Sequence, residues 1–187
     1  MNLYDLMKNR RSTREFLKKE FPVEIVQKIL NAGSYAPSGA DQKPYVFIII
    51  DDLSLKEKIR KNCVNVDKDF FNKSPDWFKN WMVGKKISLE KDFLIDAPFL
   101  VIVAGDKDKP YWLESTWLSI AYILLAAENE GVSTLTYTPS KVDFINKLLK
   151  IPLNFEPVVI LPFGFCKEKP RKKNLINKDK IFFNKYQ

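Results

Sequence analysis

Residues 36–52 read APSGADQKPYVFIIIDD. The first half, up to Pro44, consists mainly of small, polar and turn-forming residues, and it interrupts the helical spacing of apolar residues before it. The second half is a continuous apolar run, 45–50, that ends at Asp51-Asp52. An apolar run of this length between turn residues predicts a buried strand. The stretch therefore predicts a turn that leads from a helix into the core of the fold.

Further helices and strands are expected on both sides of this stretch. Upstream, we expect a short helix near residues 3–7 and a longer one over 23–33, with Pro22 in its first turn. Downstream, we expect helices over 53–61, 113–129 and 141–149, and strands over 99–104, 132–137 and 158–165. Strands separated by helices in this irregular order predict an α+β or α/β class, with a core sheet wrapped by helices. The length of 187 residues suits a single domain over 1–187.

Two segments depart from the ordinary amphipathic pattern. Residues 62–90 mix aromatic side chains with many lysines and show no clear period, which predicts a mobile cover or an irregular insertion, and thus a candidate active-site lid. Residues 113–129 are apolar nearly all round and are followed by Gly131, a suitable helix stop. A helix without a polar face is buried on every side, either in a core or between subunits.

Composition excludes several classes of function. The chain has no histidine, which removes Ser-His-Asp and Cys-His nucleophilic sites and most zinc chemistry, so we expect no metal site and expect a cofactor to carry any reaction. No Gly-x-Gly-x-x-Gly or Walker A motif occurs. The net charge of +8 raises the possibility of a nucleic-acid partner, but the lysines are scattered, so we expect none. The polar N-terminus, the absence of a long apolar stretch and the two cysteines favour a cytoplasmic protein without a membrane partner.

Residues 10–16, RRSTREF, form a basic cluster after the first short helix. In an extended segment alternate residues point the same way, so Arg10, Ser12 and Arg14 can face one ligand. Guanidinium groups suit bidentate contact with a phosphate or a carbonyl edge. On its own, however, such a stretch is better explained as a solvated basic turn.

The motifs taken together resemble the FMN-dependent nitroreductase family. RRSTREF resembles its RRSxRxF motif, and APSGADQKPY resembles APSxxNxQPW in the same position before a strand. Later landmarks are also similar in order and spacing: Asp96-Ala97-Pro98 before a strand, the long apolar helix, and Gly164-Phe165 followed by Pro170-Arg171-Lys172-Lys173. The APSGA form and the segment 134–139, TLTYTP, look more like the iodotyrosine deiodinase branch.

The resemblance implies an α+β fold with a central, mostly antiparallel sheet, a homodimer, and a C-terminal tail that extends onto the partner subunit. It also implies noncovalent FMN, bound by Arg10, Arg11, Ser12, Arg14, Pro37, Ser38, Gly39, Thr136, Thr138, Arg171 and Lys172. In this family pattern Pro37, Ser38 and Gly39 come from the partner subunit, and Thr138 acts as the catalytic residue by tuning the flavin near N5. Ordinary β-propensity at a strand end is an alternative explanation for the threonines.

For the substrate, the resemblance points to Ala40, Asp67, Phe71 and Lys91. Asp67 stands where the deiodinase branch has a Glu, and Phe71 stands where it has a Tyr, so one hydroxyl is missing. The expected function is an FMN-dependent oxidoreductase that uses NAD(P)H as transient donor to reduce small electron-poor aromatics, nitroaromatics and quinones. Two alternatives stay open, a reductive dehalogenase of the halotyrosine type and a non-catalytic flavin-binding protein.

Overall fold

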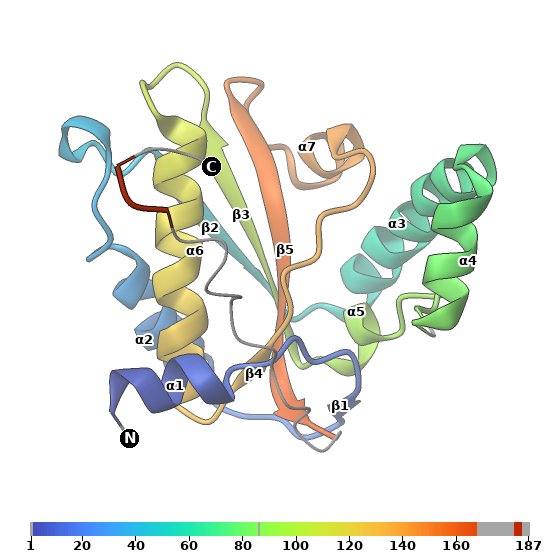
Figure 1. Ribbon diagram of the computed structural model, residues 1–187, viewed down its shortest axis with the longest axis horizontal. Helices are drawn as coiled ribbons and strands as arrows, with labels where there is room; N and C mark the ends of the chain where they lie inside the picture. The colour runs from blue at the N-terminus through green and yellow to red at the C-terminus, as the bar shows by residue number, and fades with distance from the viewer. Residues whose placement is uncertain (1, 86, 168–181, 185–187) are drawn as a thin grey trace.

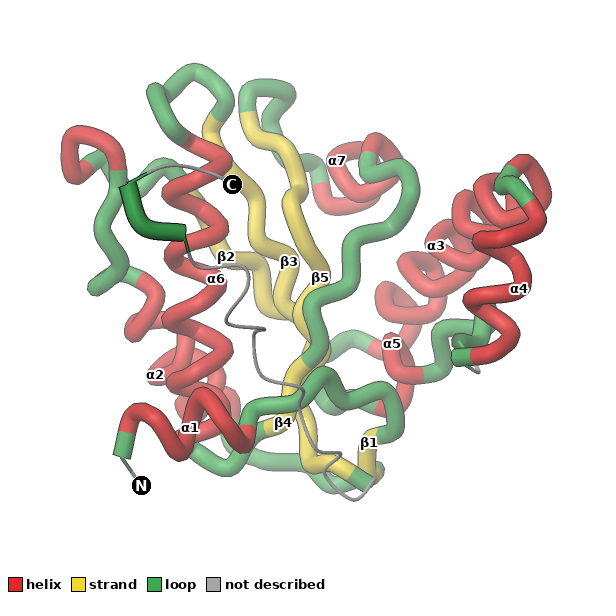
Figure 2. Tube along the Cα trace, viewed as in Figure 1, coloured by secondary structure: helices red, strands yellow, loops and turns green. Residues whose placement is uncertain are grey.

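The computed structural model describes residues 2–85, 87–167 and 182–184, and a five-stranded antiparallel sheet lies at its centre (Figures 1 and 2). The strand order is β1-β5-β3-β2, and β4 pairs with β5 on the edge opposite β3. The strands are β1 (Phe16–Leu17), β2 (Tyr45–Ile50), β3 (Phe99–Asp106), β4 (Ser133–Thr134) and β5 (Phe155–Cys166). The helices are α1 (Leu3–Asn9), α2 (Val23–Gly33), α3 (Leu53–Lys73), α4 (Asp76–Gly84), α5 (Phe93–Asp96), α6 (Trp112–Asn129) and α7 (Asp143–Leu149), with a 3-10 turn η1 (Gly39–Asp41). The α+β class with an antiparallel sheet is confirmed.

Both faces of the sheet are covered, as β3 shows. Its side chains alternate: Val101 and Val103 pack with α2 and α6, whereas Leu100 and Ile102 pack with α3, α5 and α7. All four are completely buried. The sheet is therefore the middle layer of three, with α2 and α6 on one face and α3, α5 and α7 on the other (Figure 1). A strand covered on both faces explains the uninterrupted apolar run in the sequence.

Helix α6 packs its inner face closely and leaves an apolar outer face. A Cβ added at Gly33 of α2 would lie 2.6 Å from Ser119 Oγ, so the two helices touch through small residues. On the outer face Trp117, Leu118 and Tyr122 remain about two-fifths exposed. The helix ends as the sequence predicts, because Gly131 has φ +71° in the left-handed region that glycine adopts most easily.

The expectation that residues 62–90 lack regular structure is wrong. Helix α3 does not end at Lys61 but continues to Lys73, and α4 follows almost at once, so most of the segment is helical. Beyond Val64 no residue of α3 is buried, and Met82 alone is buried in α4. We refer to residues 65–84 as the arm. The helical period is weak in the sequence because this part has almost no face that packs on a core.

Three further expectations need correction. The strand predicted over 132–137 is reduced to β4, because only Ser133 and Thr134 pair with β5; Tyr137 adds a single bridge to Ile160. The short elements β1 and α5 were not predicted at all, since two to four residues are too few to show a period. The helix predicted from Lys141 starts at Asp143.

The predicted C-terminal tail, with Arg171 and Lys172, lies outside the described residues apart from 182–184. In that short piece Phe182 and Phe183 are exposed. Among the described helices, none is both long and apolar enough to cross a membrane.

Candidate functional site

The N-terminal segment is fixed along one end of the sheet. Thr13 N donates to Thr134 O at 3.0 Å, which joins the segment to β4. Three residues later, Phe16 pairs with Cys166 at the end of β5, and Lys167 N donates to Glu15 O at 2.9 Å. Arg14 is therefore held between the ends of β4 and β5 by contacts on both sides.

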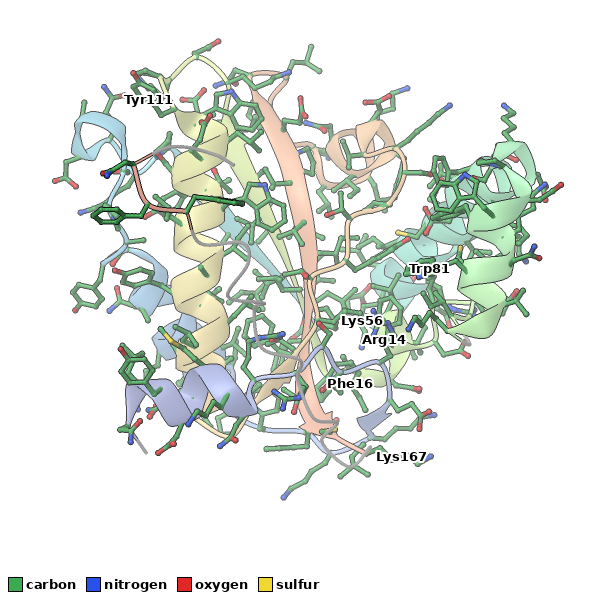
Figure 3. All side chains as sticks on the ribbon, in the orientation of Figure 1. Arg14, Phe16, Lys56, Trp81, Tyr111 and Lys167 are labelled. Atoms are coloured by element: carbon green, nitrogen blue, oxygen red, sulfur yellow. The ribbon has the colours of Figure 1, made fainter. Side chains whose placement is uncertain are left out.

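A cavity of about 430 Å³ opens beside Arg14, and we call it the arginine cavity. Figure 3 shows Arg14 and Phe16 beside the lower half of β5, on the side of α5, with Lys167 at the end of β5. The lining combines three cations (Arg14, Lys91 and Lys167) with three carboxylates (Glu15, Asp92 and Asp96) and with apolar, mainly aromatic side chains such as Phe16, Phe93 and Leu135. Thr136 and Tyr137 complete the wall nearest the sheet. Such a wall suits a flat ring system that has a polar edge.

The other residues of the basic cluster do not line this cavity. The Arg11 guanidinium donates to the carbonyl oxygens of Lys8 and Arg10, so it closes the last turn of α1. Arg10 is half-buried, and burial lowers the pKa of its guanidinium while the nearby Glu128 carboxylate of α6 opposes that shift. Ser12 forms a bridge with Thr134. Within one protomer, only Arg14 of the four predicted residues here reaches the arginine cavity.

The Pro37–Ala40 segment lies on the opposite side of the sheet, at the start of α6. Gly39 N donates to Ser115 Oγ at 3.1 Å, and an added Cβ at Gly39 would lie 2.8 Å from the Tyr111 ring. Ala40 follows with φ 50°, a backbone conformation that non-glycine residues rarely adopt and that is over-represented at functional sites. Figure 3 shows Tyr111, and with it this end of α6, far from Arg14. One protomer therefore does not bring the two predicted halves of the cofactor site together.

A second cavity, of about 320 Å³, lies between the arm and the sheet. We call it the aromatic cavity, because Phe70, Phe71, Phe78, Met82 and Leu89 form its apolar wall. Its polar lining is Asp67, Lys91, Thr138 and Ser140. The structure thus gathers Asp67, Phe71 and Lys91, three of the four predicted substrate residues, with the predicted catalytic Thr138. Lys91 lines both cavities, so they are neighbours.

Asp67 is the centre of a network at the edge of the aromatic cavity. Its Oδ2 accepts from the Tyr137 hydroxyl at 2.8 Å and lies 3.1 Å from Lys91 Nζ. Its Oδ1 accepts from Ser140 N at 3.0 Å. The side chains of Lys91 and Asp67 are only 7% and 15% exposed, so this ion pair is shielded from water. Thr138 Oγ1 donates to Val158 O at 3.3 Å.

Two uncharged groups accompany the ion pair, the buried thiol of Cys63 and the partly buried hydroxyl of Tyr137. Burial raises the pKa of the Cys63 thiol to about 12. Burial also raises the pKa of the Tyr137 hydroxyl, and the nearby Cys63 and Asp67 add to that shift, so the hydroxyl stays protonated and remains a donor. Both groups are neutral at any physiological pH.

Lys56, in the first turns of α3, fixes the chain that leads from Lys91 into β3. Its ammonium group is buried and donates to the carbonyl oxygens of Ile95 at 3.0 Å and Ala97 at 2.6 Å. Burial lowers the pKa of this ammonium, and Asp96 and Asp51 oppose the shift. The base of α3 and the turn after α5 are therefore held together.

Sequence reasoning missed three residues of the site, Tyr137, Ser140 and Lys167. Tyr137 was named only within the 134–139 segment and as the end of the strand predicted over 132–137. The chain leaves the regular strand after Thr134, so Thr136 and Tyr137 both line the arginine cavity. No sequence signal marks Ser140, which contributes a backbone N–H. Among the described residues no group of three or more Cys, Asp or Glu side chains could hold a metal ion.

Comparison with known proteins gives consistent matches. Residues 7–165 match the model of the Nitroreductase family. The chain is similar to the iodotyrosine deiodinase of Thermotoga neapolitana, 37% identical over 163 residues that cover 87% of this chain and 88% of that protein. It is similar to the iodotyrosine deiodinase of Haliscomenobacter hydrossis, 31% identical, with 95% and 85% covered. A crystal structure of an oxidised iodotyrosine deiodinase bound to FMN and 3-iodo-L-tyrosine matches with a TM-score of 0.92 at 35% identity, covering 99% of this chain and 100% of that one.

Proposed function

The chain belongs to the nitroreductase family, and on that premise we propose that it is an FMN-dependent enzyme that removes halide from halogenated phenolic rings by reduction. Its similarity to iodotyrosine deiodinases favours this reaction over the reduction of nitroaromatics and quinones that we expected first from the sequence. The reaction replaces one halogen on the ring by hydrogen and needs two electrons and one proton for each halide released.

The aromatic cavity is the observation that carries the proposal. Phe71 and Phe78 form flat apolar surfaces, and Thr138 stands at the polar side near the sheet. A halogenated ring bound here would lie next to the arginine cavity, because Lys91 separates the two spaces. Substrate and cofactor would then be neighbours within one site.

The arginine cavity supports FMN as the cofactor. Arg14 and Lys167 offer donors for the polar edge of a flavin, Thr136 adds a hydroxyl, and Phe16 is an apolar side for the ring. Reduced FMN would supply the two electrons. The proposal assigns Pro37, Ser38 and Gly39 of a second copy to the same flavin, with Arg171 and Lys172 at its phosphate, in a homodimer. The exposed apolar face of α6, next to the Gly39 segment, suits a surface between copies.

The protein's own residues then bind, orient and exclude water. The arm covers the ring with Phe71, Phe78 and Met82, and no side chain is required as a nucleophile. Thr138 keeps its place through the hydrogen bond to Val158 O and can present its hydroxyl to the reacting edge.

The test uses the purified holoprotein. We expect a yellow protein that releases FMN on heating, and after anaerobic reduction with dithionite it should release iodide from 2-iodophenol as the flavin is reoxidised. Iodide release without flavin, or reduced flavin that persists with every iodinated phenol, would contradict the proposal.

Reduction of nitroaromatics or quinones with NAD(P)H is a second candidate. The flat apolar wall of the aromatic cavity could also accommodate such rings. Steady-state oxidation of NADH and NADPH with a nitroaromatic and with a quinone measures it in the same preparation. A non-catalytic flavin-binding protein would reoxidise with neither class of acceptor.

A further inference from the structure

The charged side chains that line the aromatic cavity neutralise each other. Asp67 and Lys91 are the charged residues of the cavity lining, and they face each other at 3.1 Å. Both are largely shielded from water, so their attraction is stronger than that of a surface pair. Neither charge is available to a ligand unless the pair is opened.

Other contacts keep Asp67 turned toward Lys91. The Tyr137 hydroxyl donates to the same oxygen that Lys91 approaches, and Ser140 N donates to the other oxygen. Ser140 is itself tied to α3, because its hydroxyl donates to Val66 O at 2.9 Å. The carboxylate thus has partners at both oxygens and is held from two sides.

Lys91 is held in a similar way. Its ammonium lies 5.2 Å from the centre of the Tyr137 ring, a cation–π contact in addition to the ion pair. Arg60 holds the chain on both sides of Lys91, since it donates to Glu90 O at 2.7 Å and to the Asp92 carboxylate at 2.8 Å. Moving the Lys91 ammonium toward a ligand carboxylate would break the ion pair and the cation–π contact together.

The rest of the cavity offers an apolar surface. Phe70 and Phe78 pack edge to face, and Phe78 stacks on Trp81, so ring contacts join the residues of this wall. Phe71 has no hydroxyl to donate to a carboxylate group. A zwitterionic amino-acid side chain would have to lose its hydration, open the buried pair and find no additional donor at Phe71.

From this geometry we infer that the substrate is a halogenated phenol whose ring substituents are uncharged, and that the Asp67–Lys91 pair closes the cavity against amino-acid zwitterions. The inference rests on the proposed dehalogenation and narrows its substrate class. Tyr137 acts as a specificity-determining positioning residue, because its hydroxyl holds Asp67 in the closed pair.

The experiment compares two ligands that have the same iodinated ring. 2-Iodo-4-methylphenol and 3-iodo-L-tyrosine differ only in the zwitterionic group. We expect the methylphenol to bind the oxidised holoprotein with a Kd at least about tenfold lower, measured by calorimetry, and to show a correspondingly higher kcat/KM for iodide release. Equal or tighter binding of 3-iodo-L-tyrosine would overturn the inference, whether or not iodide is released. Failure of both compounds to give iodide would overturn the proposed function alone, since the binding ratio is still measured.

The variant Tyr137→Phe tests the positioning role. It removes one hydroxyl and keeps the ring, so Asp67 can turn toward a ligand ammonium, and the Kd ratio should shift at least about threefold toward 3-iodo-L-tyrosine. Tyr45→Phe is the matched control: its hydroxyl donates to Gly33 O at 3.1 Å away from both cavities, and the ratio should stay as in the unmodified protein. If the Tyr137→Phe variant had the same Kd ratio as the unmodified protein, Tyr137 would not set the selectivity between the two ligands.

Discussion

The two faces of the sheet are both covered by helices, but they are built differently. The α2–α6 side is a continuous apolar core, and α6 carries an apolar outer surface as well. The opposite side contains the two cavities and a buried set of polar groups: Lys56, Cys63, Asp67, Lys91 and Tyr137. Buried polar groups cost free energy unless they are paired, and here each charged one is paired.

The contrast separates a side of the sheet that contributes mainly to stability from a side that holds the candidate site. One side gains its free energy mainly from apolar contacts, although Ser115, Thr116 and Ser119 of α6 are also buried there, and its outer surface suits a second copy of the chain. The other side gains less free energy from apolar packing, because fixed charges and open space for a ligand take the place of packed apolar side chains. Substitutions on the two sides should therefore change different properties of the protein, and by different amounts.

The largest effect is expected on the outer face of α6. Trp117→Glu places a charge in the proposed homodimer interface and should weaken association by about 2–4 kcal/mol, with loss of FMN. Size-exclusion chromatography with light scattering measures the mass, and absorbance measures the flavin. Trp81→Glu on the arm is the control, because Trp81 is 49% exposed and Trp117 41%, and this variant should remain dimeric. If the Trp117→Glu protein stayed a dimer with full FMN, α6 would not be the interface.

A smaller effect is expected at the arginine cavity. Arg14→Ala removes a charged donor and should weaken FMN binding by about 1.5–3 kcal/mol, measured by fluorescence titration of the apoprotein. Lys18→Ala is the matched control, since Lys18 is 83% exposed and pairs with Asp96 only at 3.8 Å. Its effect should stay below about 0.5 kcal/mol. Equal loss of affinity in both variants would remove Arg14 from the cofactor site.

Cys63 gives this side of the sheet a pH dependence. Burial raises the pKa of its thiol to about 12 from the 9.0 of an ordinary thiol, so above pH 9 the unfolded chain releases a proton that the folded chain keeps. The contribution to stability is complete below pH 9 and falls by up to about 1.4 kcal/mol per pH unit above it. Urea unfolding at pH 8, 9 and 10 measures the slope, and Cys63→Ala supplies the comparison. The same slope in Cys63→Ala would show that the thiol does not cause it.

The smallest effect concerns the charged contacts beside the arm. Arg60→Gln should lower the free energy of unfolding by about 0.5–1 kcal/mol and speed amide hydrogen exchange near Glu90. Lys28→Gln is its control across the sheet, where Lys28 pairs with Glu130 at 2.8 Å, and it should leave exchange in the arm unchanged. In the unmodified protein, the arm should exchange faster than α6 and slow when 2-iodo-4-methylphenol binds. If the ligand did not change the rate of amide hydrogen exchange in the arm, the role of the arm as a lid would be contradicted.

The same contrast explains what the sequence could predict. The strands β2 and β3 and helix α6 were predicted closely because their residues are covered on one or both faces, and coverage selects apolar residues at a regular spacing. The arm was not predicted, since Val64 is the last buried residue of α3 and no period remains after it.

The site was predictable only in part for similar reasons. Asp67, Phe71 and Lys91 came from motif resemblance, and the structure places them around one cavity. Tyr137 was hidden by the assumption of a regular strand. The contact of Arg11 with the end of α1 depends on where that helix stops, which the sequence does not specify.

The Lys56 contacts have a mechanical consequence for the arm. They clamp the first turns of α3 to the turn before β3, and the helix runs for 21 residues from this clamped end. The part beyond Val64 extends roughly 14 Å at 1.5 Å per residue. A tilt of about 10° at the end of the clamped part would then move the tip by roughly 2 Å, while the clamped residues hardly move. The tip of the arm can therefore shift while the base of α3 stays in place, but opening the cavity at Phe71 also requires release of the hydrogen bonds that join Asp67 to Tyr137 and Ser140.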